Sequence, residues 1–411
     1  MNDNSLKIPS GWHLLTLEQI SKHITKGATP TTYGFDWSDE ISGIPFLRSE
    51  CVTSNGFNYK GMSYIPLEAH NAMERSKIFP GDILMTITGN IGRVASLPES
   101  IPEANINQHI SRISICDEHH SEYVLQALQL EFYSRYYERI LTGQAYPQIS
   151  LKQVRETPIL LPSYEEQKSI AKILLCVDKK ISAISDKIAA TQDLKKCLMQ
   201  QLFSSVGMKL IKLGELLKEK PAYGANASAC EHVFGSVRYV RITDINDRGR
   251  LLDSKVSLSL PDYKDYLLHD GDIIIARSGN TVGKSYLYNV NDGHCAYAGY
   301  LIRFRTDINK LLPRYLSQFL MTEFYWNWIK NNIKVGAQPN INAQQYQSLE
   351  IPICPISVQE NIINILETID SKIDLLEQQK SETQLLKKGL MQKLLTGEWR
   401  VPLDCDAAAA A

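Results

Sequence analysis

Long segments of this 411-residue sequence return about 190 residues further along, and this duplication constrains the fold more than any other feature. Residues 77–90 (KIFPGDILMTITGN) return as residues 267–280 (LLHDGDIIIARSGN), and residues 194–200 (LKKCLMQ) return as residues 386–392 (LKKGLMQ). Shorter matches join residues 14–17 to 210–213 and residues 143–150 to 336–342. A period this long exceeds any solenoid repeat, so it indicates a duplicated globular unit followed by a duplicated helix.

Each copy closes with a long helical run whose apolar residues alternate three and four positions apart. This spacing is the seam of a coiled coil, and about 33 residues at about 1.5 Å each give a rod of roughly 50 Å. Two matched seams would most simply bury each other as an antiparallel pair, although each helix could instead pack on the core of its own domain. The residues expected to pair the helices and dock partners are Ile170, Leu174, Val177, Ile181, Ile184, Ile188, Ile362, Leu366, Ile369, Ile373 and Leu376, with Leu194, Leu198, Leu202, Leu386, Leu390 and Leu394 continuing the stripe.

The boundaries of the helices and domains follow from the same pattern. Ser163 with Glu166 and Ser357 with Glu360 are capping-box candidates at the two helix starts. The domains expected are a first recognition domain over 1–162, a first helix over 163–205, a second recognition domain over 206–356, a second helix over 357–400, and a tail over 401–411. The terminal alanines read as a tag or placeholder residues.

Each globular unit mixes strands and helices without a regular strand–helix alternation. Residues 82–87 and 110–115 are β-rich in the first copy, as are 272–276 and 300–304 in the second. Residues 123–141 and 313–333 are aromatic-rich with a helical period. The fold class predicted is therefore α+β, with a small twisted sheet in each unit and two long antiparallel helices joining the units.

Composition narrows the protein class. Hydrophobic residues make up 44% and charged residues 22%, which is typical of globular proteins. No stretch approaches 18 consecutive apolar residues, and the first residues lack the apolar core of a secretory signal, so a membrane span and export are not expected. The eight cysteines never form C-x-x-C, which disfavours a zinc ribbon and predicts free thiols in a reducing cytoplasm.

Charge is distributed unevenly over a chain whose net charge is −1. Residues 1–162 hold 13 basic against 17 acidic side chains, whereas residues 204–357 hold 18 against 14. Neither unit could therefore bind nucleic acid by bulk charge. Binding would need a local basic face, and the first unit would depend on a partner for phosphate contacts.

Two motifs suggest chemistry, and neither completes a catalytic or metal site. Residues 279–285 (GNTVGKS) resemble a phosphate-binding P-loop, but three residues separate the glycines where the loop needs four. The sister segment, residues 89–93 (GNIGR), is shorter still, which favours a strand-ending turn with a basic tip. His119 and His120 could be metal ligands but fit a solvated turn better. With no dinucleotide, methyltransferase, zinc-protease or serine-hydrolase motif, no catalytic residues, metal site or cofactor are expected in this chain.

Polar residues gather on turns beside the β-rich runs of both units. Arginine can read guanine, asparagine and glutamine can read adenine, and aspartate can accept from cytosine. The ordinary alternative is that such residues cap turns and satisfy backbone groups. The candidate DNA-binding residues are Arg48, Thr86, Thr88, Asn90, Arg93, Gln108, His109, Gln144, Tyr146 and Gln148 in the first copy and Arg241, Asp244, Arg277, Ser278, Asn280, Thr281, Lys284, Gln338 and Asn340 in the second.

The ordered set of motifs resembles one family, the DNA-specificity subunits of type I restriction–modification systems, over about residues 10–400. One departure is residues 223–225 (YGA), which stand where the second unit should carry G-x-T-P. The motifs that carry the resemblance are residues 81–84 (GDIL) with 89–92 (GNIG), 271–274 (GDII) with Gly279, 27–30 (GATP), the helix starts 166–167 (EQ) and 358–359 (VQ), and the closing 394–399 (LLTGEW).

The resemblance implies a non-catalytic, cytoplasmic subunit of an anti-phage defence complex. Each globular unit would be a target-recognition domain that reads half of a bipartite, asymmetric sequence in double-stranded DNA. The helices would space the half-sites and dock two methylation subunits, which carry S-adenosylmethionine and flip the target adenine. Restriction and translocase subunits would use ATP and Mg²⁺. A rod of about 50 Å spans at most roughly 15 base pairs.

Two other classes of function stay open at this point. The chain could be a coiled-coil scaffold, or a DNA-binding protein that acts without restriction–modification partners. It could also be an enzyme that uses the Lys284 turn, in which case the isolated chain would bind ATP and the Lys284→Ala variant would not.

Overall fold

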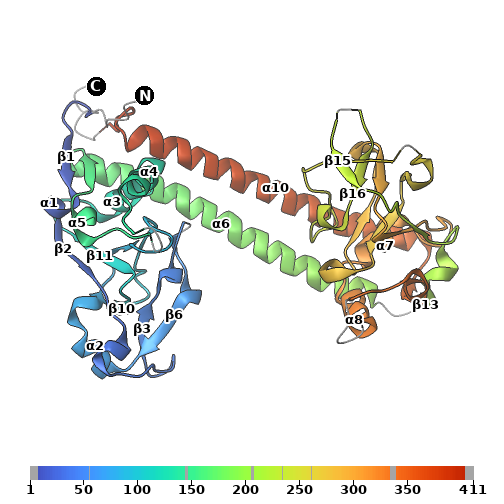
Figure 1. The fold of residues 1–411 in the computed structure, drawn as a ribbon, viewed down its shortest axis with the longest axis horizontal. Coiled ribbons are helices and arrows are strands. Elements are labelled where there is room, and N and C mark those ends of the chain that lie inside the picture. Colours follow the sequence, from blue (N-terminus) through green and yellow to red (C-terminus); the bar gives the residue numbers. More distant parts are fainter. Residues whose placement is uncertain are drawn as a thin grey trace. The chain divides into compact units, whose positions relative to one another are not determined.

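The structure is a computed structural model that describes residues 8–54, 56–143, 147–204, 208–233, 235–260, 262–333 and 339–402. Its residue contacts divide the chain into two compact units, Met1–Ile184 with Gln379–Ala411 and Ser185–Gln378. Each unit contains one globular domain together with a segment of each long helix, α6 (Tyr164–Phe203) and α10 (Ile356–Leu394) (Figure 1).

The first unit pairs its strands in the orders β2-β11-β8-β9, β6-β3-β10-β7 and β1-β12, with a hairpin β4-β5. Strands β3 and β10 run parallel, whereas β11 is antiparallel to both β2 and β8. The elements are β1 (His13–Thr16), α1 (Leu17–Ile20), β2 (Ser21–Lys26), β3 (Ile44–Leu47), β4 (Val52–Thr53), β5 (Gly56–Phe57), β6 (Met62–Ile65), α2 (Leu67–Ala72), β7 (Lys77–Ile78), β8 (Ile83–Thr86), β9 (Val94–Ser96), β10 (Ala104–Ile106), β11 (Ile110–Ile115), α3 (Ser121–Leu128), α4 (Glu131–Ile140), α5 (Leu151–Arg155) and β12 (Pro158–Leu161).

The second unit pairs its strands in the orders β14-β21-β18-β19, β15-β17-β16-β20 and β13-β22. The first and last of these repeat sheets of the first unit, whereas the middle one has β15 as an edge strand and no strand at the place of β7. The parallel pair is again present, here between β16 and β20. The predicted α+β class is thus confirmed in both units. The elements are β13 (Lys209–Lys212), β14 (Ala222–Tyr223), β15 (Ala229–Glu231), β16 (Arg238–Val240), β17 (Val256–Leu258), β18 (Ile273–Ala276), β19 (Ser285–Leu287), β20 (Cys295–Tyr297), β21 (Leu301–Phe304), α7 (Pro313–Phe319), α8 (Glu323–Asn332), α9 (Ala343–Gln347) and β22 (Glu350–Ile353).

Strands β8 and β18 are buried on both faces, which explains why their sequences are continuously apolar. Successive side chains of a strand point to opposite faces, so each strand serves two cores. In β8, Ile83 and Met85 pack with the helices, whereas Leu84 packs with the other sheet. In β18 the helix side takes Ile273 and Ile275, and the sheet side takes Ile274 and Ala276.

The aromatic-rich segments form two helices in each unit instead of one. Leu130 has an extended backbone between α3 and α4. In the second unit α7 ends at Phe319, and Thr322 caps the start of α8 because its hydroxyl accepts the Tyr325 N–H at 3.3 Å. Residues 123–141 and 313–333 are thus helical, as their period indicated, but each segment is divided into two helices.

The long helices begin 192 residues apart, at Tyr164 and Ile356, and so keep the period of their seams. Ser163 caps α6 by accepting the Glu166 N–H at 3.4 Å, while the Glu166 carboxylate bonds Arg400. Ser357 lies inside α10, so the second predicted cap is wrong; Pro355 precedes that helix and its carbonyl accepts the Gln359 N–H.

The two long helices pack antiparallel within each unit. In the first unit Ile170 and Leu174 of α6 share a core with Met391 and Leu394 of α10, and in the second unit Phe203 shares one with Ile362. All the predicted seam residues from Ile170 to Ile188 and from Ile362 to Leu376 are buried or half-buried. Their burial fits the predicted pairing of the two helices.

Beyond Ile188 and Leu376 the seam departs from the predicted leucine stripe at Leu194 and Leu386. Leu194 and Leu386 are 53% and 55% exposed, because alternate steps of three and four lead instead through Thr191 and Thr383 to lysines at 195 and 387. Lys195 bonds Asp370 and Lys387 bonds Asp178, each at 2.7 Å, across the two helices of its unit. In each pair the aspartate also accepts a hydrogen bond from a glutamine of the globular domain in the same unit. Gln318 donates to Asp370 at 3.2 Å, and Gln126 donates to Asp178 at 3.0 Å.

The cysteines of the described residues are free thiols. Cys51 and Cys295 are fully buried, and burial raises the pKa of each thiol to about 11. None of the described helices is long and apolar enough to cross a lipid bilayer.

Candidate nucleic-acid interface

In the first unit, three segments that are distant in sequence meet where β8 ends. Thr88 forms a β-bridge with Gln148, and the Thr88 hydroxyl lies 2.6 Å from His109 Nδ1. The Ile87 N–H donates to the His109 carbonyl at 2.9 Å, and the Ile149 N–H donates to the Ile87 carbonyl at 3.0 Å. We call the polar group of Thr88, Gln108, His109 and Gln148 the first strand-end cluster; Gln108 and Gln148 are exposed.

The loop after β2 completes this cluster. Thr29 lies within the predicted G-x-T-P motif, and its hydroxyl donates to the Gln108 side-chain oxygen at 2.8 Å. Gly27 permits that approach because a Cβ there would lie 1.7 Å from the Ile106 carbonyl oxygen. The motif is thus a close backbone crossing that holds Gln108 in place.

The second unit builds the equivalent group where β18 ends. Ser278 forms a β-bridge with Asn340, the Arg277 N–H donates to the Tyr300 carbonyl at 2.9 Å, and the Ile341 N–H donates to the Arg277 carbonyl at 2.9 Å. The Arg277 guanidinium lies 4.9 Å from the Tyr223 ring centre and donates to Asn340 Oδ1 at 3.4 Å. We call Tyr223, Arg277, Ser278, Tyr300 and Asn340 the second strand-end cluster.

The departure in residues 223–225 leaves this crossing intact. A Cβ on Gly224 would lie 2.3 Å from the Tyr297 carbonyl oxygen and 2.4 Å from that of Ala298. Gly224 therefore takes the place of Gly27. The exposed Tyr223 and Tyr300 belong to this cluster but were not predicted from the sequence. An alignment of the two copies on their Gly-Asp-Ile segments would have identified Tyr300, because it stands in the second copy where His109 stands in the first.

Several predicted residues serve the fold instead. Thr86 is 1% exposed, and its hydroxyl donates to the Asn90 carbonyl within the turn. Asp244 is 2% exposed and is enclosed by Arg241. Lys284 bonds Asp247 at 2.6 Å, and this bond lowers the pKa of the Asp247 carboxyl.

The remaining predicted residues are placed as follows. Asn90 and Asn280 are exposed on the turns after β8 and β18, whereas Arg93 and Thr281 are half-buried there. Arg48 is exposed, and its guanidinium lies 4.9 Å from the Trp37 ring centre. It neighbours the first cluster because the Asn107 N–H donates to the Leu47 carbonyl at 3.1 Å. Gln144, Tyr146 and Gln338 lie outside the described residues.

The turn that resembles a P-loop uses its own N–H groups. Gly279, Val282, Gly283 and Lys284 donate to carbonyls at 3.0, 3.1, 3.0 and 3.0 Å, in order those of Pro339, Gly279, Ala276 and Thr281. A phosphate cradle needs such groups free and a helix after them, whereas strand β19 begins at Ser285. The geometry gives this turn no means to enclose a nucleotide phosphate.

His119 and His120 lie on the turn between β11 and α3, where the sequence placed them, and both are half-buried. The His120 N–H donates to Gln167 at 2.9 Å, and burial lowers the pKa of both imidazoles. The second unit makes the same joint, with the Leu312 N–H donating to Gln359 at 3.0 Å. These residues join the domain to its helix, and the described part of the chain contains no group of three potential metal ligands.

Arg241→Ala is expected to reduce the free energy of unfolding of the second unit by about 1–3 kcal/mol, because a buried carboxylate loses a two-point partner. Asp244 accepts from Arg241 Nε at 3.1 Å and from its terminal nitrogen at 2.8 Å. Arg48→Ala is the matched control, since it removes a cation–π contact on an exposed side chain, which is worth about 0.5–1 kcal/mol. Urea unfolding of both variants measures the difference. Equal free energies of unfolding for the two variants would show that the Arg241–Asp244 contact does not stabilise the fold, and Arg241 would again be a candidate for binding DNA.

Comparison with known proteins agrees with this duplication. The family described as the type I restriction modification DNA specificity domain matches residues 9–191 and again residues 205–384. The specificity subunit of the type I restriction enzyme MjaVIII from Methanocaldococcus jannaschii is 24% identical, covering 97% of this chain and 95% of that protein. The StySPI specificity subunit from Salmonella potsdam is 19% identical, covering 97% and 92%.

Solved structures show the same fold. The S subunit of a type I restriction-modification system from M. genitalium matches with a TM-score of 0.57 and 16% identity, covering 96% of this chain and 97% of that one. A chain from a study of complex assembly and conformational transition in the type I R-M system matches with a TM-score of 0.60 and 17% identity, covering 96% and 100%.

Proposed function

Because the chain belongs to the family of type I restriction–modification DNA specificity domains, we propose that it reads a bipartite, asymmetric sequence in double-stranded DNA, with one half-site for each domain. Residues 1–162 and 206–356 are the two recognition domains in this proposal. The observation that carries it is the pair of strand-end clusters, which occupy equivalent places on a repeated frame.

The two clusters share their backbone but differ in their polar side chains. The first presents Gln108, His109 and Gln148, and the second presents Arg277, Tyr300 and Asn340. Glutamine and asparagine can pair with adenine edges, and arginine can pair with guanine. Two scaffolds of one topology with different tips would read two different half-sites, which is what an asymmetric site requires.

The residues proposed to contact DNA are those that the structure leaves accessible. Arg48, Thr88, Asn90, Gln108, His109 and Gln148 remain candidates in the first domain, as do Arg277, Ser278, Asn280 and Asn340 in the second, joined now by Tyr223 and Tyr300. Thr86 and Asp244 are left out of the proposal because their side chains are buried, and Arg241 is left out because its guanidinium is bonded to Asp244.

The helices are proposed to space the domains and to dock two methylation subunits on their outer faces. Apolar residues lie exposed at the same places of the repeat, Ile173 and Ile365 and likewise Leu194 and Leu386. A surface that occurs twice would bind two copies of one partner. In this proposal the chain is not catalytic; the partner subunits would supply S-adenosylmethionine, ATP and Mg²⁺, and adenine methylation would be the partner's reaction.

A methylome of the host with this gene intact and deleted tests the proposal. The expected result is a gapped, two-part adenine motif that disappears on deletion. If the motif persists, or if purified chain and methylation partner methylate no gapped duplex, the proposal is wrong. Co-purification would then show which proteins bind the helices. A chain that binds proteins but no DNA would be a scaffold.

A further inference from the structure

Helix α10 carries a row of four carboxylates within the second unit: Glu367, Asp370, Asp374 and Glu377. Their steps of three, four and three residues place them along one face of the helix. We call this row the acidic ladder.

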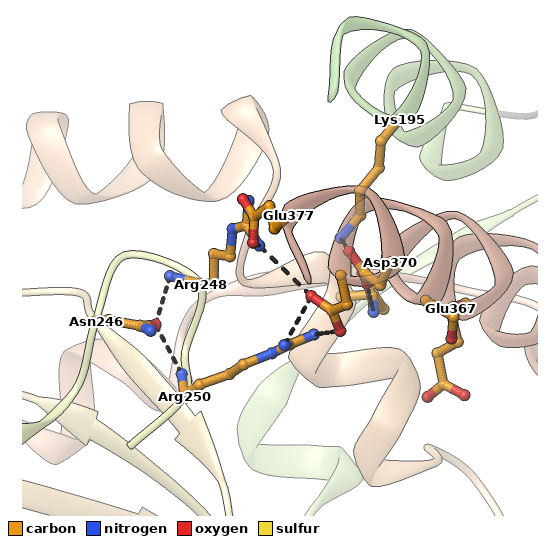
Figure 2. Close-up of polar contacts among 10 residues, drawn as sticks. Lys195, Asn246, Arg248, Arg250, Glu367, Asp370 and Glu377 are labelled. Carbon is orange, nitrogen blue, oxygen red and sulfur yellow. Dashed lines mark hydrogen bonds and ion pairs between the residues drawn. The ribbon is translucent and has the colours of Figure 1, made fainter. Parts of the chain in front are cut away.

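Every carboxylate of the ladder is bonded to a basic side chain of the same unit. Figure 2 shows the contact of Asp370 with Lys195 and the loop that carries Arg248 and Arg250. Arg314 of α7 donates to Glu367 at 2.6 Å, and Lys195 of α6 donates to Asp370 at 2.7 Å. Arg250 bonds Asp374 with two nitrogens, at 2.9 and 2.7 Å. Arg248 bonds Glu377 in the same two-point manner, at 2.8 Å for one of the contacts. Asp374 and Glu377, the C-terminal half of the ladder, thus contact a single loop of the recognition domain.

That loop, residues 246–250, has a fixed shape. The side-chain oxygen of Asn246 accepts the N–H groups of Arg248 at 2.9 Å and of Arg250 at 3.0 Å. The Asn246 N–H donates to the Arg250 carbonyl at 2.9 Å. Gly249 has a φ of +66°, and a Cβ there would lie 2.8 Å from the Ser285 carbonyl oxygen. Both arginines therefore leave a preformed turn, and a two-point guanidinium bond fixes orientation as well as distance.

A cavity of about 590 Å³ lies beside these contacts, lined by the loop, by α6, α7 and α10, and by the start of α8. Lys195, Arg248, Arg250, Asp370 and Asp374 are among its lining residues. The loop is thus held on the helix largely by ion pairs rather than by a continuous apolar core. The angle between loop and helix then depends on those pairs.

The first copy lacks the ladder. A shift of 192 residues places Leu175, Asp178, Ser182 and Ser185 at the equivalent positions of α6. Asp178 is the one carboxylate kept, and it is the residue that pairs across the helices with Lys387. The two ladder positions that hold the loop in the second unit are serines in the first.

We propose that the acidic ladder sets the angle at which the second recognition domain stands on α10, and that Arg248 and Arg250 are positioning residues rather than DNA contacts. This inference rests on the proposed function. A phosphate approaching these arginines would meet the carboxylates that already neutralise them. The two arginines act on DNA indirectly. By fixing the angle of the second domain, they fix where the second strand-end cluster meets the DNA, and this determines which gap lengths between the half-sites the complex accepts.

The test uses the full chain with its methylation partner and duplexes whose half-sites are separated by the natural gap or by one base pair more or less. Arg248→Gln with Arg250→Gln is expected to lower kcat/KM for the natural gap about tenfold, because two partly exposed two-point ion pairs are lost. The ratio of kcat/KM for the natural gap to that for the other two gaps should decrease. Lys218→Gln with Lys220→Gln changes the charge equally without touching the ladder, and should leave the preference unchanged.

A DNA-contact role would give a different pattern. Methylation would fall equally at all gaps, and the salt dependence of binding would become shallower by about two phosphate contacts. Exchanging the charges, with Arg248→Glu, Arg250→Glu, Asp374→Arg and Glu377→Arg, should restore the gap preference; no restoration with a normally folded protein overturns the inference.

A readout without DNA separates this inference from the proposed function. Hydrogen exchange of the isolated chain should become faster in residues 246–250 of the glutamine variant. Unchanged exchange would refute the ladder as the holding contact, whereas a wild-type complex that methylates no gapped duplex would refute the proposed function alone.

Discussion

Gly27→Ala is expected to reduce the free energy of unfolding of the first unit by about 3 kcal/mol or more, which is at the severe end for one methyl group. The added Cβ would lie 1.7 Å from the Ile106 carbonyl oxygen and 2.4 Å from its carbon. Both atoms belong to the backbone at the end of β10, so no side chain can move aside. The shift would also displace Gln108, which Thr29 holds through its hydroxyl. Specific DNA binding by the complex should fall with it.

Gly224→Ala should produce the same loss in the second unit, because its Cβ would lie 2.3 Å from the Tyr297 carbonyl oxygen. Gly389→Ala is the matched control. Gly389 lies inside α10 with no atom within 4 Å of an added Cβ, so alanine there should stabilise the chain by about 0.5–1 kcal/mol. Urea unfolding followed by far-UV circular dichroism measures all three. Stability of Gly27→Ala near that of the control would show that the crossing is not tight.

The elements that could be predicted from the sequence are those with local signals. Periodicity identified both long helices and their seams as far as Ile188 and Leu376, and the repeat identified the paired domains. The helical period over residues 313–333 did not show that Thr322 caps a second helix there, because such a cap depends on a single hydroxyl. Lys195 and Lys387 were missed because a lysine at a seam position looks like a defect until its partner is known. The signal was available, since Gln126, Asp178 and Lys195 recur as Gln318, Asp370 and Lys387 at a shift of 192.

The candidate interface was predictable as a set of turns but not as a set of side chains. Whether a polar residue faces outward depends on contacts between distant segments. Thr88 meets Gln148 although strands β9 to β11 and helices α3 and α4 lie between them in the sequence, and no local pattern predicts that bridge. Thr86 and Arg241 resemble their neighbours in type, yet the Thr86 side chain is buried and the Arg241 guanidinium is bonded to the buried Asp244. Residue chemistry selected turns that the structure brings together, and the long-range register then decides which of their side chains remain accessible.

Arg277→Glu is expected to lower specific DNA affinity at least a hundredfold while leaving the fold intact. Its guanidinium is held by Tyr223 at 4.9 Å and by Asn340 at 3.4 Å, both of which are exposed, so the change leaves no buried group unpaired. Loss of one base-reading arginine costs about 1–3 kcal/mol, and a carboxylate in its place adds repulsion from the DNA phosphates. The affinity of the complex for duplexes with one half-site scrambled at a time measures the effect.

The half-site dependence makes this prediction specific to the second cluster. Wild-type complex should lose affinity when either half-site is scrambled, whereas the Arg277→Glu complex should respond only to scrambling of the half-site read by the first domain. Lys310→Glu carries the same charge change on an exposed side chain that belongs neither to the second strand-end cluster nor to the acidic ladder, and it should keep dependence on both half-sites. If Arg277→Glu retained dependence on both half-sites, the guanidinium would not read DNA, and recognition in the second domain would have to rest on Asn340 and the two tyrosines. If it lost dependence on the other half-site as well, the two clusters would be coupled, which separate reading by two domains does not allow.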